Sequence, residues 1–409
     1  MNHPHPSRRR LLGTAGAAGA AGLVAGTAGG AIGHAAATEP SGPALSTVGS
    51  TAVPFHGARQ PGITTRAQSR GHLVAFDLAP DAGRGGAAGL LRRWSALAAE
   101  LMAGELPDAS TGVAADAGPS SLTCTFGFGH SFFDATGLEA QRPAALDPLP
   151  TFSNDELDPA RSDGDLWVGI GADDPLVAFH ALRQLQRAAE GTATVRWQMA
   201  GFNRGLGASA REVTTRNLMG QIDGTNNPDP EDAEADRHLF VPDTGEPAWM
   251  ARGSYVVVRR IRMLLDDWET RPADERERVL GRRTSDGAPL TGGEEGTPVD
   301  LAATGPDGSP VIAANAHVRV SAPETNGGAT MLRRPFSYHD GTREDGAPDA
   351  GLLFVCWQAD PARSFVTVQR KLDRGDALGA FIRHEASGLF AVPGGAAEGE
   401  YVGQHLLEG

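Results

Sequence analysis

VIAANAHVRVSAPETNGGATMLRRPFSYHDG, residues 311–341, places His317 in an otherwise apolar segment. The arginine pair Arg333 and Arg334 lies further along the same stretch. Upstream, GQIDGTNNP (220–228) sets Asp223 in a glycine-flanked turn. One histidine, one aspartate and one arginine are too few for a structural zinc site, which takes about four ligands. The set does contain an axial ligand for an iron and a separate acid and cation.

Length and charge narrow the function further. The 409 residues are ample for two domains. The net charge of −14 argues against a nucleic-acid partner, because phosphate binding needs a basic face. Cys124 and Cys356 each lie in an apolar, strand-like run, which favours two buried thiols over a disulfide. No C-x-x-C-H motif is present, so any haem would be held non-covalently.

The N-terminus has the pattern of an export signal. SRRRLLG (7–13) precedes an Ala/Gly-rich run that ends in an A-x-A-like site, which predicts a signal peptide over residues 1–37. The pair Arg8 and Arg9 before two leucines favours the twin-arginine route, with a membrane anchor as the alternative. Residues 38–52 are expected to form a disordered linker. No other stretch approaches the roughly 20 apolar residues of a membrane span, so no stable membrane insertion is expected after cleavage.

The first half predicts a β-α-β-β-α-β order, which is the ferredoxin-like pattern. The predicted strands are 72–78, 121–129, 166–172 and 193–203, and the predicted helices are 86–103 and 174–190. The second half repeats this pattern loosely, with strands at 253–265, 329–338 and 351–359 and helices at 266–283 and roughly 372–384. The final helix is expected to hold Asp376 and Phe381. We therefore predict an α+β protein of two ferredoxin-like halves with antiparallel sheets, at residues 53–219 and 220–409.

Several sequence blocks, in this order, resemble those of the dye-decolourising peroxidases, specifically the twin-arginine-exported class that includes the iron-transport-associated deferrochelatase/peroxidases. The resemblance runs from about Val53 to Gly403. It rests on VPFHGARQPGI (53–63), FGFGHSFFD (126–134), GQIDGTNNP (220–228), WMARGSYVVVRRIRM (249–263), MLRRPFSY (331–338), GLLFVCWQAD (351–360) and FIRHEASGLFAVPGG (381–395), together with the His317 segment.

The resemblance implies one non-covalent b-type haem per chain, between the sheet and helices of the C-terminal half. It implies an exported, periplasmic or extracellular enzyme that uses hydrogen peroxide to oxidise phenolic, dye-like or other one-electron donors through a ferryl intermediate. A role in iron uptake, as a deferrochelatase or Fe(II) oxidase, is an alternative, and a non-catalytic haem carrier is another. Iron-transport partner proteins and a homo-oligomer also stay open.

Three residues carry the expected chemistry. His317 is the expected axial ligand of the haem iron, since a neutral imidazole nitrogen can bind iron(III); His130 and His180 are the competing histidines. Asp223 is expected to move the peroxide proton, although an aspartate before glycine is also an ordinary turn residue. Arg333 is expected to stabilise the charge that develops as the O–O bond breaks. Arg334 would point to the opposite face if both arginines lie on a strand.

Other residues have supporting roles under the resemblance. Asp376 would accept a hydrogen bond from His317, with a solvated helix acid as the alternative. Leu352 and Phe354, at strand spacing, would narrow access on the distal side of the haem. The remaining candidates are Thr225 and Asn227, which would orient the Asp223 loop, and Arg319, which would pair with a haem propionate.

Bulky donors would be oxidised by electron transfer through a surface Trp or Tyr, since they cannot enter a closed haem pocket. The candidates in the second half are Trp249, Trp268, Trp357 and Tyr338. Trp357 stands where the family pattern leads us to expect tyrosine, which leaves the electron route open.

Overall fold

A computed structural model describes residues 47–106, 112–206 and 214–409. The predicted signal peptide at 1–37 therefore lies outside the described residues. The described chain belongs to one compact unit, Pro43–Gly409. The expected linker at 38–52 is partly ordered, because α1 (Thr47–Ser50) is helical and the Thr51 carbonyl accepts a 2.7 Å hydrogen bond from the Ser121 N–H.

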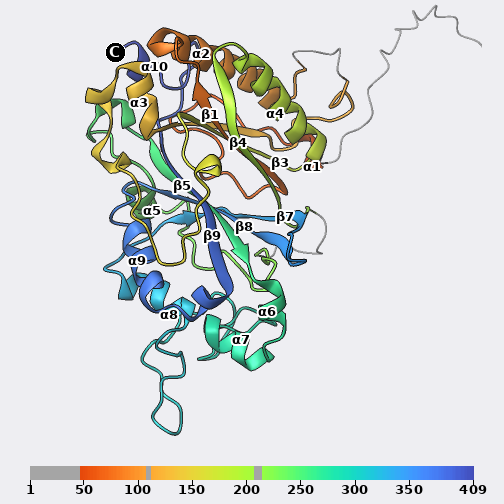
Figure 1. The fold of residues 1–409 in the computed structure, drawn as a ribbon, viewed down its shortest axis with the longest axis vertical. Coiled ribbons are helices and arrows are strands. Elements are labelled where there is room, and N and C mark those ends of the chain that lie inside the picture. Colours follow the sequence, from red (N-terminus) through yellow and green to blue (C-terminus); the bar gives the residue numbers. More distant parts are fainter. Residues whose placement is uncertain (1–46, 107–111, 207–213) are drawn as a thin grey trace, which may run out of the picture. The chain divides into compact units, whose positions relative to one another are not determined.

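The first half is a ferredoxin-like unit. Its sheet has the order β2-β3-β1-β4, with every pairing antiparallel. Asp174 accepts from the Leu176 and Val177 N–H groups and so begins the second long helix where the sequence predicts. The elements are β1 (Arg70–Leu78), α2 (Gly83–Met102), β2 (Thr123–Gly129), α3 (His130–Thr136), β3 (Leu166–Ala172), α4 (Pro175–Ala189) and β4 (Ala193–Phe202) (Figure 1).

The second half repeats the arrangement with the order β9-β5-β8-β7, again antiparallel. Its elements are α5 (Ala233–Leu239), β5 (Ser254–Met263), α6 (Leu265–Glu269), α7 (Ala273–Leu280), α8 (His317–Ser321), β6 (Leu332–Arg333), β7 (Phe336–Thr342), β8 (Pro348–Gln358), α9 (Phe365–Gly375), β9 (Ile382–Val392) and α10 (Gln404–Leu407). Short 3-10 turns cover Glu139–Gln141, Ala144–Leu146, Pro159–Arg161, Ala248–Met250, Pro323–Thr325 and Ala377–Phe381.

Three predicted elements of this half are wrong in detail. The helix expected at roughly 372–384 lies instead at Phe365–Gly375, and Ile382 already begins β9. The charged helix expected at 266–283 is two short helices, since Pro272 cannot continue α6. The strand expected at 329–338 is divided into β6 and β7 at Pro335, which has no N–H for the ladder.

The two half-sheets join into a closed ring of eight strands. The half-sheets meet where β2 pairs with β9 and where β4 pairs with β7, and β5 pairs with β8 to complete the circuit. Each seam is short: Phe128 and Gly129 pair with β9, and Phe202 alone pairs with β7. Strand β6 pairs with β8 along the same edge as β7.

The core has two main parts. Helices α2 and α4 cover one face of the first sheet (Figure 1), where Trp94 stacks on Phe126 with ring centroids 5.5 Å apart. The inner faces of both half-sheets share a second core that contains Trp167, Trp357 and Phe390. Burying such aromatic side chains contributes about 1.5–3 kcal/mol each, so this shared core fixes one half against the other.

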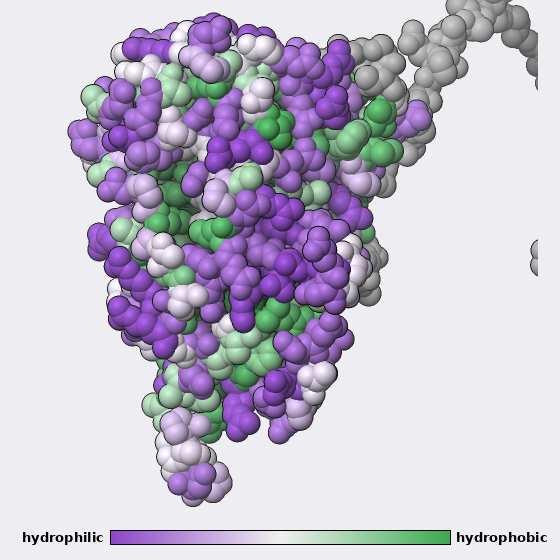
Figure 2. All heavy atoms as spheres, viewed as in Figure 1, coloured by the Kyte–Doolittle hydropathy of each residue, from purple (hydrophilic) through white to green (hydrophobic). Residues whose placement is uncertain are grey.

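The surface of the described residues is mainly polar. On the face shown in Figure 2, hydrophilic residues predominate and hydrophobic residues form scattered patches. Among residues 47–106, 112–206 and 214–409, no helix combines the length and hydropathy needed to cross a bilayer.

Candidate active site

His317 is the first residue of α8, and its ring orientation is fixed by one carboxylate. Its Nδ1 lies 2.7 Å from Oδ2 of Asp376, whose side chain is only 3% exposed. The other carboxylate oxygen, Oδ1, accepts a 3.0 Å hydrogen bond from the Leu378 N–H. Because a carboxylate is an acceptor, it favours the tautomer with the proton on Nδ1. The Nε2 lone pair of His317 is then available to a metal.

The pKa of His317 shows which charges surround it. Burial alone would lower this pKa, but the charge and hydrogen bond of Asp376 raise it above its usual value. The charge of Arg333 lowers the pKa and that of Asp223 raises it. The direct contacts of these residues form two pairs, His317 with Asp376 and Arg333 with Asp223.

Asp223 and Arg333 form an ion pair. Arg333 Nη1 donates to Asp223 Oδ1 at 3.1 Å, and Asn217 Nδ2 donates to the other carboxylate oxygen at 3.3 Å. The Asp223 and Arg333 side chains are 15% and 28% exposed. A carboxylate and a guanidinium in contact can accept and return a proton beside a fixed positive charge.

Asn227 holds the backbone of Arg333. Its amide donates to the Arg333 carbonyl at 2.8 Å and accepts from the Arg333 N–H at 3.1 Å. This reciprocal pair ties the loop after Asp223 to strand β6. Thr225 turns elsewhere, since its hydroxyl donates to Glu295 Oε1 at 3.0 Å.

Arg334 follows β6 directly, and its partners differ from those of Arg333. Its guanidinium donates to the Gly62 carbonyl, to the Arg66 carbonyl at 3.0 Å and to Gln68 Oε1 at 2.8 Å. Burial lowers the pKa of Arg334 to about 10. Arg334 thus links the second half to the first, and it does not contact Asp223.

Arg319 is bound to the backbone of the preceding loop. Its Nε and Nη2 atoms donate to the carbonyls of Leu301, Ile312 and Ala313 at 2.7–3.2 Å. These bonds hold the approach to α8. The predicted pairing of Arg319 with a propionate stays a prediction.

Leu352 and Phe354 lie on one face of β8, as predicted. Leu352 is buried, while Phe354 is only partly buried and lies 6.1 Å from the Phe365 ring of α9. Cys356 continues the same face, and its partner across the strand pair is Arg333. The face therefore runs from an apolar wall to the distal arginine.

These residues fit a haem. The His317 side chain is 29% exposed while its Nδ1 is held by Asp376. The Asp223–Arg333 ion pair supplies an acid and a cation, and Leu352 and Phe354 supply apolar side chains on one face of β8. An imidazole ligand with an acid, a cation and apolar side chains is a donor set that suits haem iron.

The structure also places the two cysteines and the two competing histidines. Cys124 and Cys356 are buried free thiols, as expected. His130 begins α3 and lies near Arg142 and Asp134, while His180 is buried in α4 of the first half. The His130 Nδ1 lies 4.0 Å from Asp134 Oδ2, a longer contact than the 2.7 Å between His317 and Asp376.

Sequence reasoning missed Asn217 and Arg282. Arg282 Nη1 donates to the carbonyls of Gly287 and Glu295 at 2.8 and 2.9 Å. Burial lowers the pKa of Arg282, the charge of Glu295 raises it, and the charge of Arg333 lowers it. The only sequence signal for a role of Asn217 is its position six residues before Asp223, since a short loop can bring its two ends together.

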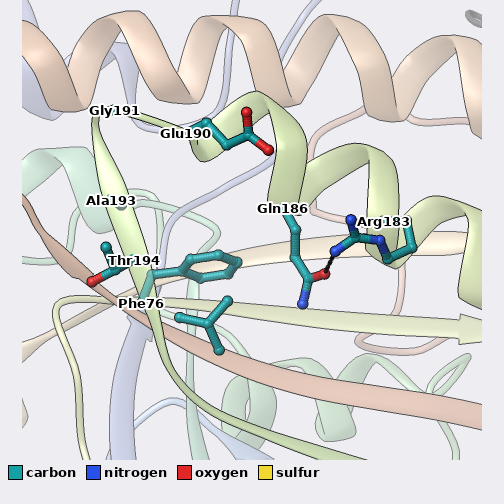
Figure 3. A pocket seen from close by; sticks show the side chains of 8 residues that line it. Phe76, Arg183, Gln186, Glu190, Gly191, Ala193 and Thr194 are labelled. Carbon is teal, nitrogen blue, oxygen red and sulfur yellow. Dashed lines mark hydrogen bonds between the residues drawn. The ribbon is translucent and has the colours of Figure 1, made fainter.

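A separate hollow lies in the first half and shares no residue with this site. Its lining comes from β1, α4 and β4 and includes Phe76, Glu190 and Thr194 (Figure 3). On its α4 wall Arg183 donates to Gln186 at 2.7 Å.

Comparisons with known proteins identify the family of the chain. Residues 60–203 match the family model of the Dyp-type peroxidase N-terminal domain, and residues 214–397 match that of the C-terminal domain. The predicted boundary at 219/220 falls just after the start of the C-terminal match and stays a prediction.

Individual relatives cover most of the chain. A dye-decolorizing peroxidase of Thermobifida fusca is 49% identical over 86% of this chain and 84% of its own length. A deferrochelatase of Escherichia coli K12 is 36% identical over 98% and 97%. Among solved structures, a DyP-type peroxidase from Streptomyces coelicolor is 68% identical with a TM-score of 0.88, covering 90% of this chain and 100% of that one. Ferric DtpA from Streptomyces lividans is 68% identical with a TM-score of 0.87, over the same shares.

Proposed function

The chain belongs to the Dyp-type peroxidase family and is a haem peroxidase, and from this premise we propose that it is an exported enzyme that oxidises phenolic or dye-like one-electron donors with hydrogen peroxide. The single observation that carries the proposal is the pair of contacts that orient these groups, His317 Nδ1 with Asp376 and Arg333 with Asp223. One b-type haem per chain would be held non-covalently through His317, and when bound it would supply the redox-active iron of the reaction.

On the proximal side, His317 would bind the iron through Nε2. The Asp376 carboxylate keeps the proton on Nδ1 and draws positive charge toward it, which makes the imidazole a more basic ligand. Arg319 holds the loop that leads into α8, so the histidine is presented from a braced segment.

On the distal side, Asp223 would take a proton from one peroxide oxygen and return it to the other. Arg333 contacts the same carboxylate, so its charge lies where negative charge develops as the O–O bond breaks. Asn227 fixes the Arg333 backbone and so limits the positions that the guanidinium can occupy. Phe354 and Leu352 would restrict the space to small oxidants.

Electrons from bulky donors would arrive through the protein. Trp357 lies in β8 opposite Leu332, next to the Arg333–Cys356 pair, and its ring is 5.9 Å from Trp167. We propose Trp357 as the first relay, because its aromatic contact leads away from the site into the first half. Export is proposed on the twin-arginine pattern at residues 7–13.

A role in iron uptake is the second candidate, favoured by the 36% identity to a deferrochelatase. In that role iron-transport proteins would be partners, and haem or ferrous iron would be the substrate. Release of iron from added haem, or peroxide-dependent loss of Fe(II), separates this candidate from dye oxidation. A haem carrier is disfavoured, since carriage needs neither Asp223 nor Arg333.

The first test is an absorption spectrum of haem-loaded protein before and after one equivalent of peroxide. We expect a Soret band that shifts rapidly in the wild type and slowly in Asp223→Asn and Arg333→Leu. His317→Ala is expected to lose the haem. A Soret band that peroxide only bleaches at equal rates in all of these proteins would contradict the peroxidase assignment of the site.

A further inference from the structure

Asn217 lies in a braced loop that contains the distal aspartate. The Asp223 N–H donates to the Thr215 carbonyl at 2.9 Å, which closes the loop. The Trp268 indole donates to the Met219 carbonyl at 3.0 Å and anchors the loop tip. Asn217 therefore sits in a fixed backbone, six residues from Asp223.

The orientation of the Asn217 amide is determined by its neighbours. Its Oδ1 accepts from the N–H groups of Met219 at 3.0 Å and Gln221 at 3.3 Å. Only the oxygen of the amide can accept, so the NH2 group must face the other way. It faces Asp223 Oδ2, at 3.3 Å.

We infer that Asn217 is a positioning residue for the peroxide reaction, which holds the Asp223 carboxylate in its orientation. The inference rests on the proposed acid–base role of Asp223. Arg333 holds Oδ1 and Asn217 holds Oδ2, so the carboxylate plane is set from both ends. The 3.3 Å distance is long, and such bonds often tighten when the reacting molecule binds.

Four charged groups share this environment. Arg333 contacts Asp223, and His317 feels the charge of both. Arg282 acts on Arg333, and Glu295 acts on Arg282 while accepting from Thr225. Asn217 is the uncharged donor in this set, so replacing it can change the hydrogen bond without removing a charge.

Asn217→Asp is the strongest perturbation, because it keeps the shape and the loop acceptor but faces Asp223 with an oxygen and adds a negative charge there. Asn217→Ser removes the donor without adding a charge and is measured beside it. The probe is cyanide, since HCN must lose its proton to a distal base before it binds iron as the anion. In the haem-loaded variant we expect association of cyanide, and the reaction with peroxide, to slow by about 10- to 100-fold, the range of a hydrogen bond to an ionised group. The acid limb of both pH–rate profiles is expected to move up by about one pH unit or more.

Controls separate this role from a structural one. Asn203→Asp makes the same change at a residue that donates to the carbonyls of Gln68 and Pro335. It is expected to affect stability without moving the acid limb. Wild-type rates and an unmoved acid limb in Asn217→Asp would overturn the inference.

A second variant keeps the inference testable if Asn217→Asp folds poorly or binds haem poorly. Asn217→Ser keeps a loop acceptor but is too short to reach Asp223. A double-mutant cycle of Asn217→Ser and Asp223→Asn in the haem-free chain is expected to show non-additive unfolding free energies; strict additivity would refute the contact. Slow cyanide binding in Asp223→Asn alone, with Asn217→Asp unchanged, would overturn the inference only. Unchanged rates in Asp223→Asn would overturn the proposed function as well.

Discussion

Replacing Asp376 by asparagine should weaken haem binding, because this carboxylate meets two demands at once. Oδ2 accepts from His317 and Oδ1 accepts from the Leu378 N–H. Asparagine has one oxygen, so one of these bonds must be lost. If the oxygen serves Leu378, the amide NH2 faces Nδ1 and favours the tautomer protonated on Nε2, which cannot bind iron.

The size of the effect follows from burial and charge. A hydrogen bond to an ionised group contributes about 1.5–3 kcal/mol, and the Asp376 side chain is 3% exposed, so solvent screens it little. At about 1.4 kcal/mol for each factor of ten, the dissociation constant of haem should rise roughly 10- to 100-fold. Outer partners of metal-binding histidines affect affinity to about the same extent.

The assay is a titration of the haem-free chain with haem, followed at the Soret band. Asp373→Asn is the matched control, because Asp373 lies three residues before Asp376, near the end of α9, and accepts from the Ser153 N–H and hydroxyl. Its haem affinity should equal that of the wild type. An Asp376→Asn protein with a wild-type dissociation constant and an unchanged Soret band would refute the argument from tautomer and acceptor.

Arg259→Met should destabilise the protein by about 3–5 kcal/mol in denaturant unfolding, because it leaves the buried Asp155 carboxylate without its partner. Burial, assisted by the charge of Arg259, holds the pKa of His384 at about 3. An unfolded histidine titrates near pH 6.5, so the unfolded chain binds more protons in between, and lowering the pH from 7 to 4 should cost about 3 kcal/mol of stability that His384→Leu does not lose. Trp357→Phe should slow oxidation of bulky dyes and leave the peroxide step unchanged, as stopped-flow mixing would show.

Each of these has a clear contrary result. Arg252→Met loses only an exposed ion pair with Asp243, so a loss of stability equal to that of Arg259→Met would contradict the burial argument. Parallel pH–stability curves for wild type and His384→Leu would show that His384 does not titrate differently on folding. Equal dye rates in Trp357→Phe would remove Trp357 from the electron route.

Local sequence signals predicted the first half of the fold well. Residues 166–172 are apolar and lie between aspartates, and β3 has those bounds. Asp174 and Pro175 are start signals, and α4 begins there. These features depend on near neighbours, so the sequence alone suffices for them.

The strand β9 shows where such signals fail. Arg383 and Glu385 interrupt its apolar pattern, and the helix predicted at roughly 372–384 overlaps the first residues of this strand. In the structure Glu385 accepts from Arg262 at 2.7 Å and from the fully buried Arg260 at 3.3 Å. A charge that is neutralised across strands cannot be distinguished from a solvated one without knowing the register.

The site divides in the same way. The family resemblance assigns roles to His317, Asp223 and Arg333, and the structure pairs Asp223 with Arg333. The same resemblance suggests Asp376, which the structure places against His317. The sequence does not indicate Asn217 and Arg282, because their contacts depend on how the loops before β5 and after α7 fold. Orienting residues that lie in matched sequence blocks can be predicted, whereas those that depend on loop conformation cannot.

The closed ring of strands determines whether either half of the protein can be produced alone. A strand at an open edge presents unpaired N–H and C=O groups that recruit other chains. In the ring, the outer strands of each half-sheet are protected by those of the other, through the short seams at Phe128–Gly129 and Phe202. Either half made alone would expose its two lateral strands as templates for aggregation. The duplicated halves therefore act as each other's edge protection, and soluble expression of one half is not expected without the other.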